Sequence, residues 1–154
     1  MTLTVAARMT AGAVTIDERA GLQHLVDLVE GSRVAGVSVV DDVGRLLGTV
    51  DTADHPDLFG SAGGTRVAGT RRHRRRRARQ QQAVAGDLMT AATAVRDTWT
   101  VARAAQTLAA AGVDVAVVVD DLGCVRGTIT TRQCQPVPAA RTAPKEAGRD
   151  QVRV

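Results

Sequence analysis

The chain contains one stretch of sequence twice: residues 39–50 read VVDDVGRLLGTV, and residues 118–129 read VVDDLGCVRGTI. Seven of the twelve positions are identical, and four of the other five pair two hydrophobic residues or lie in the central turn. An internal repeat indicates how many structural units a chain forms, so it takes precedence over other features. We expect the 154 residues to form two similar units.

The repeat extends upstream with an offset of 79 or 80 residues, which implies one single-residue difference in length. Residues 5–6 match residues 84–85, the MTA of residues 9–11 recurs at 89–91, and Asp17 matches Asp97. This division predicts a first repeat at 1–59, a Gly/Arg-rich flexible insert at 60–83, a second repeat at 84–134 and a disordered tail at 135–154.

Each copy predicts the same order of elements. Helical spacing of hydrophobic residues is found at Leu22, Leu25, Val26 and Val29, and again at Val101, Ala105, Leu108 and Ala109. Asp17 and Asp97 are candidate caps for these helices, and Gly31 and Gly112 are candidate ends. Runs of β-branched residues then predict buried strands, each followed by an Asp-Asp-x-Gly turn.

The fold class is therefore α/β (α+β), with two β-α-β-β-α units. One unit this small buries too little apolar surface to be stable alone. We expect the two units to pack their sheets together about a pseudo-twofold axis.

These segments resemble CBS domains, and their tandem arrangement resembles a CBS pair, or Bateman module. The resemblance rests on Met-Thr before each unit, on Val-Val-Asp-Asp-x-Gly after the first long strand, and on Gly-Thr-hydrophobic at the end of the next. It implies adenosine-type ligands such as AMP, ATP or S-adenosylmethionine. In such members a Ser or Thr faces the phosphate, and an Asp three residues later accepts hydrogen bonds from the ribose.

The first copy resembles this pattern at the ribose position. Asp54 stands where the ribose-binding Asp is expected, but Asp51 replaces the hydroxyl that would face a phosphate. A carboxylate there would repel a phosphate by about 1 kcal/mol in water. The first cleft is therefore expected to favour an uncharged or cationic adenosyl compound.

The second copy resembles the pattern at the phosphate position instead. Thr130 and Arg132 suit a phosphate, whereas Gln133 replaces the ribose-binding Asp. The resemblance also assigns further residues to the lining of the two clefts, namely Val14, Ile16, Thr49, Thr128 and Thr131. Asp54 and Thr130 could equally serve only as caps of the short helices that follow their strands.

The charge of the chain is concentrated in the insert. The formal net charge is +4, but without seven arginines the chain carries 13 basic and 16 acidic residues, a net charge of −3. Those seven are Arg71, Arg72, Arg74, Arg75, Arg76, Arg77 and Arg79. They form either a solvated linker, which we favour, or an arm that binds nucleic acid or another anionic partner through unspecific phosphate contacts.

The remaining features exclude several classes of protein. No catalytic constellation or metal-ligand spacing is present, so we expect neither an enzyme nor a metal site. No apolar run is long enough for a membrane helix, and we expect no secretory signal, because residues 1–5 lack a basic region followed by an apolar stretch. Cys124 and Cys134 are expected to be free thiols in the cytoplasm.

Three functions remain open. The first is a homodimeric regulatory or sensing module with an adenosyl ligand in one degenerate cleft. The second is a dimeric scaffold whose Arg-rich arm binds an anionic partner, and the third is a ligand-free dimerisation module.

Overall fold

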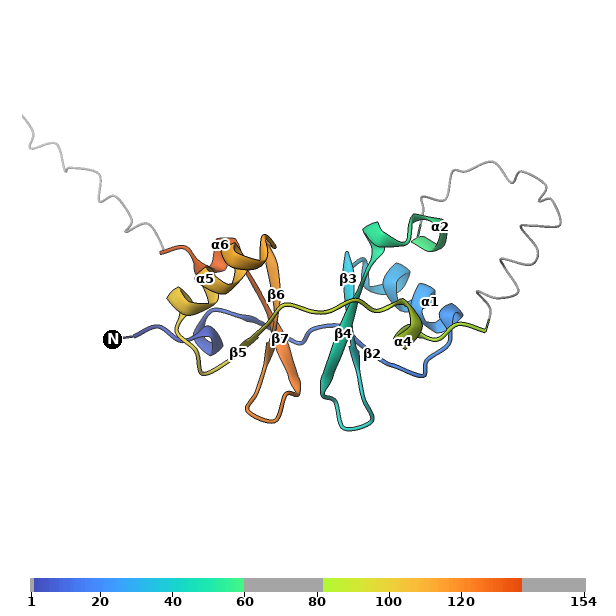
Figure 1. Ribbon diagram of the computed structural model, residues 1–154, viewed down its shortest axis with the longest axis horizontal. Helices are drawn as coiled ribbons and strands as arrows, with labels where there is room; N and C mark the ends of the chain where they lie inside the picture. Colours follow the sequence, from blue (N-terminus) through green and yellow to red (C-terminus); the bar gives the residue numbers. More distant parts are fainter. Residues whose placement is uncertain (1, 60–81, 137–154) are drawn as a thin grey trace, which may run out of the picture.

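The structure, a computed structural model, describes residues 2–59 and 82–136, which form two similar halves side by side (Figure 1). The first half comprises β2 (Thr15–Asp17), α1 (Leu22–Ser32), β3 (Gly36–Val40), β4 (Leu46–Asp51), η2 (Thr52–Asp54) and α2 (Pro56–Phe59). The second comprises β5 (Ala94–Arg96), α5 (Val101–Ala111), β6 (Val115–Val119), β7 (Val125–Thr130) and α6 (Thr131–Cys134). The predicted α+β class and β-α-β-β-α order are confirmed. Among the described residues, no helix is long and apolar enough to span a membrane.

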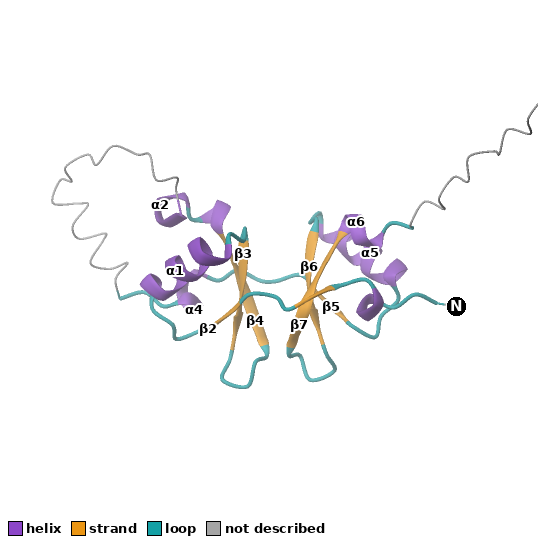
Figure 2. Ribbon diagram, turned by 180° about the vertical axis from the view of Figure 1, so that it is seen from behind, coloured by secondary structure: helices purple, strands orange, loops and turns teal. Residues whose placement is uncertain are grey.

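The two halves repeat the same strand pairing. Strand β2 runs parallel to β3, and β3 runs antiparallel to β4, while β5, β6 and β7 repeat this arrangement. The sheets lie next to each other at the centre of the molecule, and α1 and α5 lie on the outer sides (Figure 2). Each half thereby buries one face of its sheet against its own helix.

The two long helices bury the expected hydrophobic face, with one correction. Leu25 and Val29 of α1 are buried, as are Val101 and Leu108 of α5. Ala104 is the buried alanine of α5, whereas the predicted Ala105 is half-buried and Ala109 is exposed. Small residues leave the helical face poorly defined, because alanine carries too little apolar surface to mark one side.

The predicted ends of the helices are partly wrong. Thr100, and not Asp97, caps α5, since its hydroxyl accepts a hydrogen bond of 3.1 Å from the N–H of Arg103. Asp17 closes a local turn by accepting from the N–H of Arg19 at 2.8 Å, and α1 begins after Gly21. Gly112 ends α5 with φ +66°, as predicted.

The first helix does not end at Gly31. It runs on to Ser32, and Arg33 takes the left-handed conformation with φ 52°.

The Asp-Asp-x-Gly turns close both hairpins in the same way. Asp41 accepts from the N–H groups of Val43 and Arg45 at 3.0 and 2.9 Å, and Asp120 makes the equivalent bonds at 2.9 and 3.0 Å. Gly44 and Gly123 follow with φ +87° and +84°. A carboxylate that satisfies two backbone N–H groups makes these aspartates structural, as predicted.

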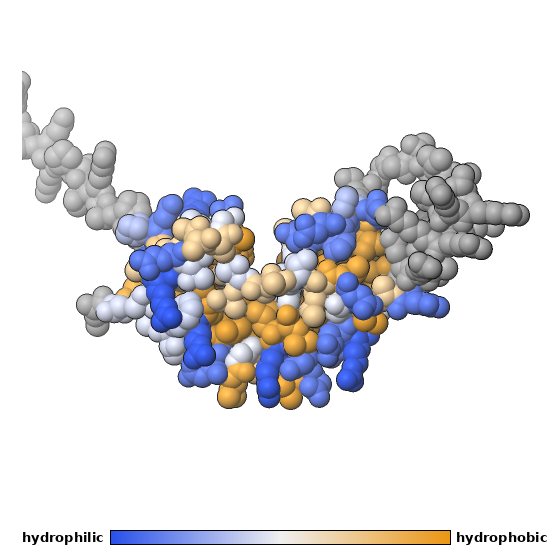
Figure 3. Space-filling model, in the orientation of Figure 1, coloured by the Kyte–Doolittle hydropathy of each residue, from blue (hydrophilic) through white to orange (hydrophobic). Residues whose placement is uncertain are grey.

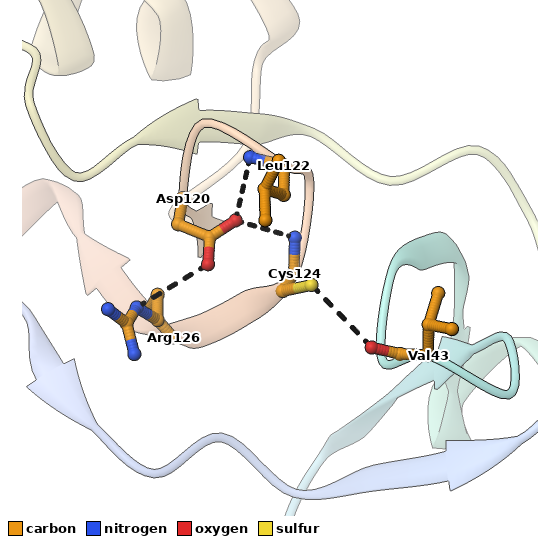
Figure 4. A network of polar contacts seen from close by, with 5 residues as sticks. All are labelled: Val43, Asp120, Leu122, Cys124 and Arg126. Carbon is orange, nitrogen blue, oxygen red and sulfur yellow. Dashed lines mark hydrogen bonds and ion pairs between the residues drawn. The ribbon is translucent and has the colours of Figure 1, made fainter.

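The two turns also hold the halves together. The N–H of Leu46 donates to the carbonyl of Gly123 at 2.9 Å, and that of Val125 donates to Gly44 at 3.2 Å. Cys124 lies at this junction, where its thiol donates to the carbonyl of Val43 at 3.6 Å (Figure 4). The junction relates the halves by the same near-symmetry as the sequence repeat.

The segments that precede the two repeats are exchanged between the halves. Val5, in the short helix η1 (Val5–Ala7), lies in the core of the second half. Ala85, in α4 (Ala85–Leu88), lies in the core of the first half. Strand β1 (Thr10–Ala11) likewise pairs antiparallel with β7. Each core is therefore completed by the segment that leads into the other repeat.

The exchange also corrects the alignment of the copies. The N–H of Val5 donates to Trp99 at 2.8 Å, and that of Ala85 donates to Ala20 at 2.9 Å. These two bonds are equivalent in the two halves. Val5 and Ala85 therefore occupy the same position in the two copies, and Val84 does not correspond to Val5. The extra residue of the first copy lies at residues 12–13, where Gly12 adopts φ +83°.

Candidate functional site

A solvent-open hollow of ≈ 320 Å³ lies where β7 ends and α6 begins. Its lining consists of Asp114, Val115, Thr130, Thr131, Arg132 and Gln135. Figure 3 shows the surface notched between the two halves on the side of α2 and α6, opposite the hairpin turns. This volume lies at the lower end of the range for small-molecule sites.

The hollow is shaped by a tie between two segments of the second half. Thr131 donates twice to the carbonyl of Asp114, from its N–H at 2.9 Å and from its hydroxyl at 3.4 Å. In the first half, Thr52 makes the same two bonds to Ala35, at 2.9 and 3.0 Å. Thr131 therefore fixes the start of β6 beside the start of α6.

Thr130 and Gln133 form a capping box at the start of α6. The N–H of Gln133 donates to the Thr130 hydroxyl at 3.2 Å, and Oε1 of Gln133 accepts from Thr130 N–H at 2.9 Å. The Gln133 amide nitrogen reaches across to the hydroxyl of Thr10 at 2.9 Å. The two residues expected to face phosphate and ribose are thus bonded to each other and to β1.

The capping role of Thr130 gives a prediction for stability. Thr130→Ala should lower the free energy of unfolding by about 1 kcal/mol without any ligand, because the N–H of Gln133 loses its acceptor and the Gln133 amide oxygen loses the Thr130 hydroxyl. Thermal unfolding followed by circular dichroism measures this change. Thr107→Ala is the control, since that exposed helical hydroxyl donates only to a carbonyl one turn earlier. An unchanged melting temperature for Thr130→Ala would contradict the cap.

Arg132 is the cation of the hollow. Its side chain is exposed, and no ion pair joins it to the rest of the described chain. Asp114 brings a carboxylate to the same lining, and Val115 an apolar wall that is 52% exposed. The sequence pattern missed Asp114, since only the tie to Thr131 brings it beside a strand end 16 positions later.

The corresponding end of the first half is acidic. Asp51 caps η2 by accepting from the N–H of Ala53 at 2.9 Å, and Asp54 is exposed on η2. His55 follows, with Nε2 at 3.2 Å from the carbonyl of Leu88 in the exchanged segment. Neither carboxylate favours an anion, so this end differs in charge from the hollow of the second half.

The other predicted lining residues lie in the sheets or, for Val14, directly before β2. Ile16 is buried in the core of the first half at 4% exposure, with Val14 packed beside it. Thr49 bridges to Thr90, and Thr128 lies opposite Thr10. The structure brings together Thr130, Thr131 and Arg132 of the predicted set. All the predicted site residues remain predictions as ligand contacts.

Two further features complete the description. Burial against the core of the second half raises the pKa of the Cys134 thiol by desolvation. No cluster of three His, Cys, Asp or Glu side chains that could hold a metal occurs within residues 2–59 and 82–136. The arginines from Arg71 to Arg79 lie outside the described residues.

Solved structures with this architecture are CBS-domain pairs, so the chain has the fold of a tandem CBS pair. One is the CBS domain of a CBS domain-containing membrane protein from Sphaerobacter thermophilus, at 20% identity and a TM-score of 0.71, covering 86% of each chain. Another is CBSX2 in complex with AMP, at 24% identity and a TM-score of 0.65, covering 86% of this chain and 92% of that one.

A third is the CBS domain of a bacterial CNNM/CorC family Mg²⁺ transporter in complex with ATP. It is 19% identical, with a TM-score of 0.64, and the match covers 86% of this chain and 84% of that one. No protein-family model matches the sequence, and no curated protein matches it. At these identities the likeness establishes the fold.

Proposed function

We propose that this chain is a non-enzymatic regulatory module of the CBS-pair type, which binds an adenosine phosphate such as AMP in the hollow of the second half. The observation that carries the proposal is Arg132. Arg132 lines a ligand-sized hollow, and its guanidinium makes no ion pair with the described residues. Guanidinium groups match phosphate in charge and in fork geometry.

The charge of the two ends supports this choice of half. Asp51 and Asp54 make the end of the first half unfavourable for a phosphate, whereas Arg132 balances Asp114 in the second. Complexes of the same fold with AMP and with ATP support an adenosine phosphate. An uncharged or cationic adenosyl compound, such as S-adenosylmethionine, would instead fit the first half.

Isothermal titration of AMP, ATP and S-adenosylmethionine into the full chain tests the proposal. Arg132→Ala should weaken AMP about tenfold or more, because a hydrogen bond to a charged group contributes about 1.5–3 kcal/mol. Arg19→Ala removes the same charge from an exposed turn of the first half and should leave AMP affinity unchanged.

Other results of the same titrations would contradict the proposal. AMP binding that survives Arg132→Ala but disappears with Asp54→Ala would move the site to the first half. If no ligand binds or raises the melting temperature, the pair is a ligand-free dimerisation module. The bonds that Thr130 and Gln133 already make to each other favour this second candidate.

We propose in addition that the module is a homodimer. A half this small leaves part of its apolar surface in water, and outside the hollow Val113 and Leu47 are 37% and 40% exposed. The mass of the full chain in solution, measured by light scattering across a range of concentrations, tests this. A mass that stays monomeric throughout would refute it.

A further inference from the structure

A residue can recognise a ligand only through hydrogen-bonding positions that the fold leaves free. Gln133 has few such free positions. Its amide oxygen accepts from the N–H of Thr130 at 2.9 Å and from the Thr130 hydroxyl at 3.2 Å. Its amide nitrogen donates to Thr10 at 2.9 Å. To accept hydrogen bonds from a sugar, Gln133 would have to give up the cap of α6.

Thr131 is engaged in a similar way. Its hydroxyl donates to the carbonyl of Asp114, so it is held against the backbone at the start of β6. The Thr130 hydroxyl is held by two bonds to Gln133. The hydroxyl groups of the lining therefore act mainly within the protein.

Asp114 differs from these residues. Its backbone is fixed by the two bonds from Thr131, whereas its carboxylate makes no ion pair or side-chain hydrogen bond within the described chain. Asp114 is exposed and is one of the residues that line the hollow. The first half has Ala35 at the equivalent place, so this acceptor occurs only in the second half.

We infer that Asp114, and not Gln133, is the residue that reads the sugar hydroxyls of the ligand. This inference rests on the proposed function. An ionised carboxylate offers two oxygens, which match the two neighbouring hydroxyls of a ribose. Arg132 supplies donors for a phosphate in the same hollow, and Val115 supplies an apolar wall for a base.

The direction in which ligand affinity changes when the Asp114 carboxylate is removed distinguishes recognition of the ligand from repulsion of it. Asp114 carries a negative charge near the place of the phosphate, which opposes binding. Water and salt screen that opposition in an open hollow, whereas a direct hydrogen bond to a carboxylate is among the stronger kinds. Removing the carboxylate should therefore weaken a ligand that has hydroxyls and should not weaken inorganic phosphate.

The test is a set of titrations on the full chain with AMP, 2′,3′-dideoxy-AMP and inorganic phosphate. Asp114→Ala should weaken AMP about tenfold and leave phosphate unchanged or slightly tighter. Wild-type protein should bind dideoxy-AMP as weakly as Asp114→Ala binds AMP. Asp121→Ala is the matched control, because that exposed aspartate of the same half lies in the hairpin turn and, among the described residues, forms an ion pair with Arg96 alone.

Three outcomes would overturn the inference. The first is that Asp114→Ala leaves AMP binding unchanged or tightens it, which would mean that the carboxylate does not contact the ligand or repels it. The second is that wild type binds AMP and dideoxy-AMP equally, which would mean that the ribose hydroxyls do not contribute to affinity. In both cases a loss of AMP with Arg132→Ala keeps the proposed function. If wild type binds no AMP, the proposed function fails and this inference fails with it.

Folding of each variant is checked by thermal unfolding followed through Trp99, the single tryptophan of the chain. Asp114→Asn keeps the shape of the side chain while removing its charge. It should give the same loss of AMP as Asp114→Ala if the ionised carboxylate is the acceptor. Wild-type affinity in Asp114→Asn would overturn that assignment.

Discussion

Gly127→Ala is expected to destabilise the second half by about 3 kcal/mol, at the upper end of what overpacking usually costs. Gly127 lies in β7 opposite Ala11 of β1, and a Cβ built there overlaps the carbonyl oxygen of Thr10. It also comes within 3.0 Å of the carbonyl carbon of Thr10 and 3.1 Å of the Ala11 Cα. All three are backbone atoms, so no side-chain rotation can relieve the overlap.

The measurement is the melting temperature, which should fall by about 10 °C for a chain of this size. Gly31→Ala is the control, since a Cβ there meets nothing within 4 Å. Because Gly31 lies inside α1, that change should raise stability by about 0.5–1 kcal/mol. A Gly127→Ala protein as stable as wild type would show that β1 does not lie against β7.

The equivalent glycine of the first half should respond in the same direction. A Cβ on Gly48 would lie 2.6 Å from the carbonyl oxygen of Thr90 and 3.0 Å from the sulfur of Met89. The methionine side chain can move aside, but the carbonyl cannot. Gly48→Ala should therefore destabilise the protein, by less than Gly127→Ala.

Val5→Asp is expected to remove the native fluorescence of Trp99, although residue 5 belongs to the first repeat of the sequence. Val5 is 0% exposed in the core of the second half, and its N–H donates to the Trp99 carbonyl at 2.8 Å. An unpaired carboxylate at such a place should cost about 4 kcal/mol or more. Trp99 packs against the same core and reports on it directly.

Leu3→Asp is the matched control. Leu3 is 44% exposed, so the same charge two residues earlier stays in water and should leave the fluorescence of Trp99 and the melting temperature near wild type. If Val5→Asp left Trp99 unaffected, the segment would belong to the core of its own repeat and the exchange would be refuted.

The repeat predicted the order of the elements because hydrophobic period and turn chemistry are local. The Asp-Asp-x-Gly turns formed as expected, since one carboxylate can satisfy two N–H groups of its own turn. The exchange of Val5 and Ala85 could not be predicted in this way. Apolar residues indicate that a segment is buried, but they do not say in which of the two cores it is buried.

The site shows the same limit. The sequence placed Thr130, Thr131 and Arg132 at one strand end, and the structure brings all three to one hollow. It missed Asp114 because that residue joins them only through the backbone tie from Thr131. The bonds between Gln133 and Thr130 are local, of the kind that a Thr-x-x-Gln pattern indicates, whereas the bond from Gln133 to Thr10 depends on an exchanged segment that the pattern cannot show.

The exchanged segments have a consequence for how the chain folds during its synthesis. The core of the first half includes Ala85, with Leu88 and Met89 packed against it, so residues 2–59 alone leave that core open as they emerge from the ribosome. The core of the second half includes Val5, which has already emerged and must wait for residues up to Ile129. Domains usually fold one after another as the chain grows. Here the first half can close only once residues up to Met89 have been made, and the second only once Ile129 has been made, so neither core is completed by its own repeat alone.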